Sequence, residues 1–203
     1  MTEGAATRSA WPPTTSRLVV SLALLVAAVG ACRGREAPDF RPTSTIKDIM
    51  DSMVDPSGDF MFESVAEIAD ERGITHKEPR TDEEWKEVRR HAIVLLEAPI
   101  LLTMEGRRVA NPGEKSENPQ VELQPEEIQK LIDSDRPSFV RRARRLQDAA
   151  AMALKAIDVK NRDALFQSIE SIDHACENCH LHYWYPNDKR AQEAAKESGL
   201  VVD

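Results

Sequence analysis

Apolar residues recur every three to four positions along most of the chain from Thr45 onward, with polar residues between them. This spacing places the apolar residues on one face of a helix. The pattern is interrupted by proline, glycine and capping residues, which mark the ends of helices. The first predicted helix begins near Thr45, is interrupted at Asp55-Pro56 and continues to Gly73. The second begins at Thr81 with a capping box to Glu84, has a kink at Pro99 and ends at Gly106. A short helix begins at Pro125, a third long helix begins at about Pro137, and a fourth begins at Asn161 and ends by Pro186.

Two of these stretches carry features that matter for function. The fourth helix has an inward stripe that ends in two cysteines. The third helix has four arginines on its polar face, where we expect a solvated surface or local ion pairs rather than a phosphate site. Residues 107–123 are polar and show no core pattern. The stripe of the fourth helix is Leu165, Ile169, Ile172, Cys176 and Cys179, and the arginines are Arg141, Arg142, Arg144 and Arg145.

The composition favours a helical domain, and the net charge bears on which kinds of partner the protein could bind. Only 5% of the 203 residues are aromatic, and β-branched runs are scarce, so we expect an all-α fold. The net charge of −8 argues against nucleic acid as a partner. An acidic surface is compatible with docking to a basic patch on a redox protein, although it commonly serves only solubility.

The N-terminus has the layout of an export signal. An apolar run, Leu18–Val29, follows Arg8 and Arg17 and leads to Cys32 through small residues. Val29-Gly30-Ala31-Cys32 looks like a bacterial lipobox, which implies removal of residues 1–31 and a lipid on Cys32. The alternatives are a plain exported protein and an uncleaved anchor, but the run is about 12 residues and a membrane span needs about 20. Residues 32–44 are expected to form a lipidated tether on the periplasmic side of a bacterial membrane.

The sharpest chemical signal is Cys176-Glu177-Asn178-Cys179-His180. This C-x-x-C-H run is typical of c-type haem attachment, in which both thiols form thioethers and the adjacent imidazole binds the iron. A disulfide or thioredoxin-like redox pair is one alternative, but no strand precedes this motif. Zinc, with His174 and His182 nearby, is another. On a helix both point away from the arc of about 100° that holds Cys176, Cys179 and His180.

A covalent haem on the last of four helices resembles the cytochrome c-prime family, the class II cytochromes c. The resemblance covers Thr45 to Pro186 and implies an antiparallel four-helix bundle with one haem c, followed by a tail over residues 187–203. Many relatives are dimers, so a homodimer is possible here. Some family members bind small gases at a five-coordinate iron, and others take a methionine from the first helix and carry electrons.

Matched to that first helix, the candidate distal ligands are Met50, which is favoured, and Met53. The plain alternative for both is a core methionine that fills space. Met152, on the third helix, is expected to be core rather than ligand, and Met61 and Met104 are expected to pack. Gas-binding relatives often have a basic residue soon after the motif, whereas Leu181-His182-Tyr183 follow it here, which favours electron transfer.

The sequence therefore predicts a lipid-anchored monohaem c-type cytochrome that passes single electrons between extracytoplasmic redox proteins and is not an enzyme. The main alternative is a five-coordinate haem protein that binds NO or CO. An accessory lipoprotein whose motif has another role is a third possibility. Peroxidase chemistry is disfavoured because no distal acid–base pair is evident.

Overall fold

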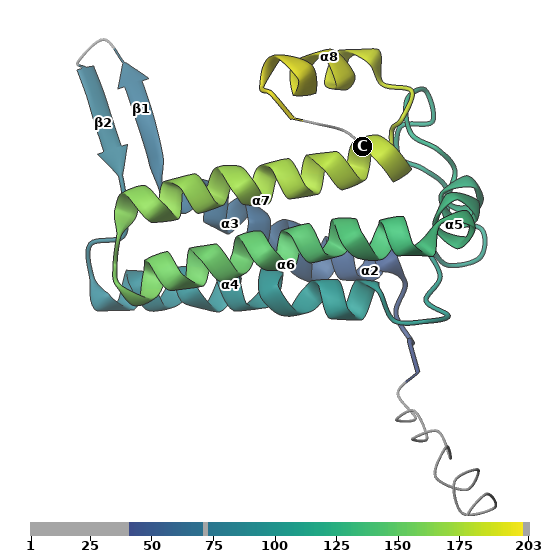
Figure 1. Ribbon diagram of the computed structural model, residues 1–203, viewed down its shortest axis with the longest axis horizontal. Coiled ribbons are helices and arrows are strands. Elements are labelled where there is room, and N and C mark those ends of the chain that lie inside the picture. Colours follow the sequence, from purple (N-terminus) through teal and green to yellow (C-terminus); the bar gives the residue numbers. More distant parts are fainter. Residues whose placement is uncertain (1–40, 71–72, 201–203) are drawn as a thin grey trace, which may run out of the picture. The chain divides into compact units, whose positions relative to one another are not determined.

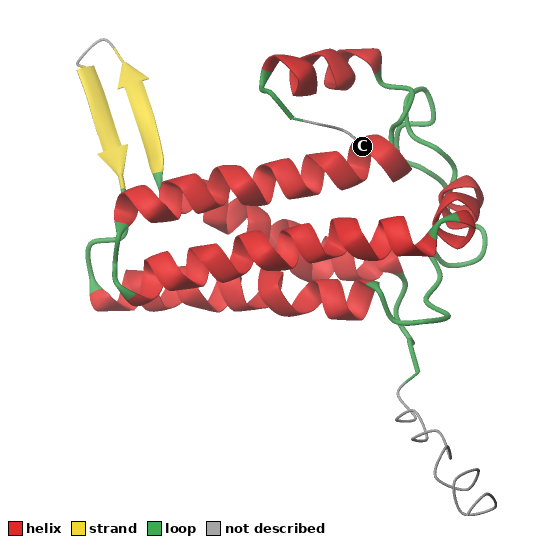
Figure 2. Cartoon of the chain, viewed as in Figure 1, coloured by secondary structure: helices red, strands yellow, loops and turns green. Residues whose placement is uncertain are grey.

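The structure is a computed structural model that describes residues 41–70 and 73–200. The chain divides into two units, residues 1–40 and 41–203, and only the second contains described residues. The signal peptide and Cys32 therefore lie outside the described residues. The described part is mostly helical with little sheet, as the all-α prediction requires (Figures 1 and 2). Its elements are α2 (Ile46–Ile49), η1 (Met50–Val54), α3 (Asp55–Ser64), β1 (Ala66–Asp70), β2 (Gly73–Lys77), α4 (Asp82–Leu102), α5 (Pro125–Ser134), α6 (Arg136–Asp158), α7 (Arg162–Tyr183) and α8 (Lys189–Glu197).

Side-chain caps begin the helices at the positions that the sequence predicted. Thr45 and Thr81 each form a capping box, with Asp48 and Glu84 respectively. The Asn161 side chain accepts a hydrogen bond from the Ala164 amide, 3.0 Å away. Each cap satisfies amide groups that have no partner within the helix, so the predicted starts near Thr45, Thr81 and Asn161 are confirmed.

The interruption predicted at Asp55-Pro56 takes the form of a π-helical turn. In η1 the Asp55 amide donates to the Met50 carbonyl, five residues back, and α3 restarts at Asp55 with Pro56 in its first turn. Proline has no amide hydrogen and its ring crowds the preceding turn, so a widened turn relieves the clash. The helical path continues, and Met50 stands at its widened part.

The helix does not continue to Gly73, and that prediction was wrong. α3 ends at Ser64, Val65 adopts an extended conformation, and β1 and β2 pair as an antiparallel hairpin. Gly73 has a φ of +121°, which L-residues other than glycine rarely adopt, so it suits the turn. The β-branched side chains of Val65, Ile74 and Thr75 also favour extended backbone.

The long helices pack side by side. α4 contacts α6, α6 contacts α7, and the α2–η1–α3 segment lies against α4, with α3 also reaching α7 (Figure 1). Their apolar faces meet in one core, whose fully buried members include Met61, Leu95, Leu165 and Ile172, together with Ile128 of α5. Met61 therefore packs as predicted. A fully buried side chain of this size contributes about 1.5–3 kcal/mol relative to exposure.

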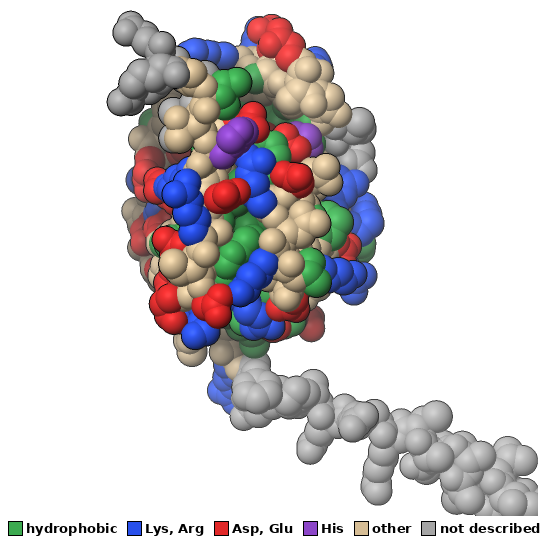
Figure 3. Space-filling model, turned by 90° about the vertical axis from the view of Figure 1, so that its left-hand side faces the viewer, with side chains coloured by type: hydrophobic (Ala, Val, Ile, Leu, Met, Phe, Trp, Pro, Cys, Tyr) green, Lys and Arg blue, Asp and Glu red, His purple; other side chains and the backbone are tan. Residues whose placement is uncertain are grey.

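Ion pairs join the elements at the end where α4 and α7 begin. Lys160 pairs with Asp82 at 2.6 Å and Arg89 with Asp158 at 3.1 Å, and Arg162 reaches Glu67 of the hairpin at 3.5 Å. Acidic and basic side chains are intermixed on the face seen in Figure 3. Exposed ion pairs of this kind each contribute little to the stability of the fold. We therefore interpret this face as a solvated surface that carries charges of both signs.

The polar segment between α4 and α5 packs against the helices, contrary to the expectation that it has no core. Its Val109 is 1% exposed. The Ile46 and Lys47 amides donate to the Arg108 and Val109 carbonyls at 2.8 and 2.9 Å. Further along, the Leu123 amide donates to the Trp184 carbonyl at 2.8 Å. The segment thus ties the start of the first helix to the end of α7.

Candidate functional site

The C-x-x-C-H motif lies in the last two turns of α7. Cys176 and Cys179 are free thiols, half-buried, and pack against the core. Burial raises the pKa of Cys176 to about 12 and that of Cys179 to about 11. Reactive redox cysteines instead have lowered pKa values, so the surroundings of these thiols do not suit a thioredoxin-like pair.

His180 follows the two cysteines and faces a cavity. Burial lowers the pKa of His180, against the opposite effect of the Asp55 and Glu177 carboxylates. The imidazole is therefore neutral at pH 7 and has a nitrogen lone pair available to a metal. Its ring lies 5.8 Å from that of Tyr185, whose hydroxyl donates to Glu177 at 2.7 Å.

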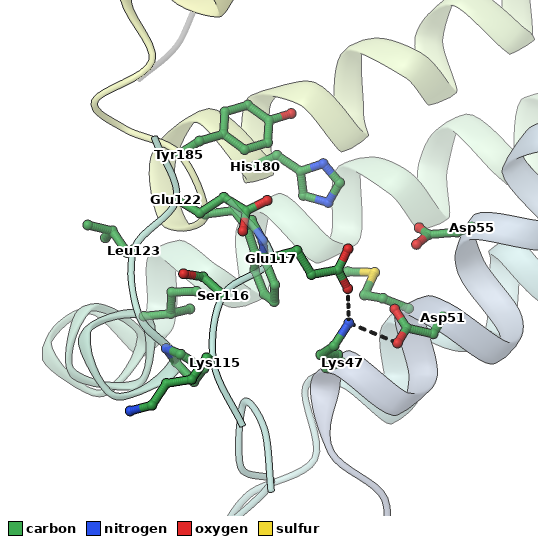
Figure 4. A pocket seen from close by; sticks show the side chains of 14 residues that line it. Lys47, Asp51, Asp55, Lys115, Ser116, Glu117, Glu122, Leu123, His180 and Tyr185 are labelled. Carbon is green, nitrogen blue, oxygen red and sulfur yellow. Dashed lines mark hydrogen bonds and ion pairs between the residues drawn. The ribbon is translucent and has the colours of Figure 1, made fainter. Parts of the chain in front are cut away.

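The cavity beside His180 has a volume of about 210 Å³ (Figure 4). It lies between the end of α7 and the first helical segment, and the connection before α5 forms its third wall. Leu123, Ile128 and Trp184 give it an apolar side. The complete lining is Lys47, Met50, Asp51, Asp55, Lys115, Ser116, Glu117, Glu122, Leu123, Pro125, Ile128, His180, Trp184 and Tyr185.

Charged residues form the other side of the cavity. The Lys47 ammonium lies 3.0 Å from Asp51 and 2.9 Å from Glu117, and both pairs are drawn in Figure 4. These carboxylates raise the pKa of Lys47, so it remains protonated. Asp55 is exposed as a residue, yet partial burial of its carboxyl raises its pKa. The Lys47–Glu117 pair joins the first helix to the third wall.

The methionines differ in position. Met50 lines the same cavity as His180, whereas Met53 packs half-buried against the core and is not part of the lining. Met152 was expected to be a core residue, and that prediction was wrong because it is 47% exposed on α6. The Met104 sulfur lies 3.3 Å from the Arg107 guanidinium. Of the candidate ligands, Met50 is therefore the one that shares a cavity with His180.

The donor set fits a covalent haem. A neutral imidazole and a thioether from two helical segments line one partly apolar cavity, and two free thiols lie on the same helix as the imidazole, outside the lining. The cavity is smaller than the roughly 300–1,000 Å³ usual for organic ligands. A complete macrocycle would therefore require the third wall, held by the Lys47–Glu117 ion pair and the Leu123–Trp184 hydrogen bond, to move outward.

Two findings concern the described residues alone. Across 41–70 and 73–200, no three His, Cys, Asp or Glu side chains form a group that could hold a metal ion. A haem iron takes four ligands from its macrocycle and needs only one or two from the protein. Within the same residues, no helix is both long enough and apolar enough to span a bilayer.

Sequence reasoning missed a polar network behind the motif. Arg142 was assigned to a solvated face, but it is 4% exposed and donates to Asn178, which is 1% exposed. Its position, three residues after Phe139 and four before Leu146, places it on the apolar stripe of α6, and this signal could have revealed it. Tyr183 is also buried and packs edge-on against Phe139, with ring centroids 5.5 Å apart.

Comparison with protein-family models, with curated proteins and with solved structures finds no match to this chain. The fold and the geometry of the site are therefore the basis for a functional assignment.

Proposed function

We propose that this protein is a monohaem c-type cytochrome that carries single electrons between extracytoplasmic redox proteins. The haem would be attached at Cys176 and Cys179, with His180 as the proximal ligand and Met50 as the distal one. The observation that carries the proposal is the cavity that His180 and Met50 share, together with the two free thiols that precede His180 on α7. The haem would supply the one-electron iron couple, and the protein would set its potential and accessibility.

The proposal includes the scaffold and the location. The α2–η1–α3 segment, α4, α6 and α7 would form an antiparallel four-helix bundle of the cytochrome c-prime type, and their mutual contacts support this arrangement. A lipid on Cys32 would hold the protein at a bacterial membrane on the periplasmic side. Acylation at a single cysteine suffices for stable anchoring only if more than one chain is attached.

The experiment is expression of the full chain in a host that matures c-type cytochromes. Denatured mature protein should carry one haem per chain by mass, and its pyridine haemochrome spectrum should be of the c type. Cys176→Ala and Cys179→Ala should weaken or abolish covalent retention, whereas Met152→Ala, on an exposed face, should leave it intact. A wild-type chain with no haem mass would end the proposal.

Gas binding remains the second candidate because one wall of the cavity is held by an exposed ion pair and could admit a small ligand. Reduced wild-type protein separates the two functions. An iron that already has Met50 should bind carbon monoxide poorly, whereas a five-coordinate iron should bind it readily.

A further inference from the structure

Arg142 is the exception among the arginines of α6. Arg141 and Arg144 are exposed, whereas Arg142 lies between α6 and α7 with 4% exposure. Placing a charge in the protein interior costs several kcal/mol unless hydrogen bonds compensate for the lost water. The partners of the Arg142 guanidinium therefore decide what it can do.

Two contacts of the Arg142 guanidinium go to the segment that contains the C-x-x-C-H motif. One terminal nitrogen donates to the Asn178 side-chain oxygen, and the other lies 3.2 Å from Nδ1 of His182. Arg145 donates to the same Asn178 oxygen at 3.1 Å. Asn178 lies two residues before His180, inside the motif, and His182 lies two residues after it. The network therefore joins α6 to α7 on both sides of His180 in the sequence.

The network holds the face of α7 opposite to the ligand. At about 100° per residue, Asn178 and His182 each lie about 160° around the helix from His180. Fixing two positions on this rear face fixes the rotation of the helix about its own axis. The rotation in turn decides whether the His180 ring points into the cavity.

The charge of Arg142 also acts on the haem side of the helix. Its guanidinium bonds to Asn178, which lies between Cys176 and Cys179 and within one helical turn of both proposed attachment positions. Reduction of a haem iron removes one positive charge from the site. A fixed neighbouring cation therefore favours the reduced state, and it does so more strongly from a buried position than from the surface.

We propose that Arg142 is a positioning residue for the haem: it holds α7 with His180 directed into the cavity, and its buried charge raises the reduction potential of the iron. This inference rests on the proposed function, because it requires a haem at Cys176 and Cys179. It gives α6, which lies outside the motif, a role in setting the reduction potential of the iron.

The test compares Arg142→Met with Arg141→Met, a matched control that removes the same charge from an exposed position on the same helix. Covalent haem per chain and the midpoint potential are measured for both. Arg142→Met should lower the equilibrium constant for reduction about three- to tenfold, where tenfold corresponds to about 59 mV for one electron. Arg141→Met should stay within about twofold of the wild type, and less at high salt.

Arg142→Lys separates charge from geometry, because it keeps the cation but loses the planar fork. It should restore most of the potential. If Arg142→Met does not fold, Arg142→Met with Asn178→Leu replaces both partners by apolar groups and should show the same lowered potential. Haem-loaded Arg142→Met with the potential of Arg141→Met would overturn the inference alone. A wild-type chain without haem would overturn the proposed function and this inference with it.

Discussion

In the proposed cytochrome, replacing Met50 by alanine should open the sixth coordination position of the iron. Met50 and Met53 are both half-buried, but only Met50 shares the cavity with His180. Full burial would make a methionine-to-alanine change cost about 2–5 kcal/mol, so half-burial suggests roughly 1–2 kcal/mol for either residue. Packing therefore predicts similar losses of stability, and coordination is what should distinguish the two variants.

The assay is absorption spectroscopy of oxidised and reduced protein, with a carbon monoxide titration and a midpoint potential. Met50→Ala should turn a low-spin spectrum into a high-spin one, bind carbon monoxide and lower the potential, since a thioether favours reduced iron. Met53→Ala, the matched control, should keep the wild-type spectrum. A wild-type protein that is high-spin and binds carbon monoxide readily would refute the reasoning and favour gas binding. Opening by Met53→Ala alone would transfer the ligand role to Met53.

Three further predictions concern the lipid, the core and acid stability. Cys32→Ala should abolish acylation and release the protein from membranes, as detergent partition and the mass of the N-terminal peptide would show; a wild-type N-terminus within residues 33–44 without acyl mass would contradict it. Met61→Ala should lower the free energy of unfolding by about 2–5 kcal/mol in urea because Met61 is fully buried, while Met152→Ala, on an exposed face, should stay within about 0.5 kcal/mol. Burial lowers the pKa of His91 below its ordinary value of 6.5, so its contribution to stability is complete above pH 6.5 and is lost as the pH falls through the folded-state pKa. His91→Gln should therefore lose less stability than the wild type between pH 7.5 and 5, and an equal loss in both would show that His91 is not responsible.

Local signals predicted the helix starts because their causes are local. The side chains of Thr45, Thr81 and Asn161 each reach an amide three residues ahead, so a short stretch of sequence contains the whole interaction. The cysteine and histidine positions on one arc of α7 follow in the same way from helix geometry. The candidate site residues of α7 could thus be proposed from the sequence alone.

The hairpin could not be predicted in this way because its supports are distant. Phe60 and Met61 continue a helical pattern toward Val65, and the local preference of Val65 for extended backbone is weak beside that pattern. The hairpin also contacts the start of α7, where Arg162 pairs with Glu67 and lies 2.9 Å from His76. Such tertiary contacts routinely override local propensity.

The same limit applies to the cavity. Its third wall consists of polar residues whose pattern predicts only a surface loop, and the wall exists because the Leu123 amide meets the Trp184 carbonyl and Glu117 meets Lys47. These partners are far apart in sequence. A sequence can therefore indicate what α7 carries, while the shape of the space in front of His180 requires the fold.

The π-helical turn has a local cause in the sequence and also affects the shape of the cavity. Pro56 cannot donate an amide hydrogen, and the chain widens into η1 just before it, with Met50 at the first position of the widened turn. A residue inserted into a turn rotates the later part of the helix by about 100°, so regular helical spacing cannot rank Met50 against Met53 across η1. The cavity ranks them instead, since it contains Met50 on one side and His180 on the other. The turn before Pro56 and the cysteine motif of α7 thus contribute residues to the same cavity. Arg142 bonds to α7 on the face opposite His180.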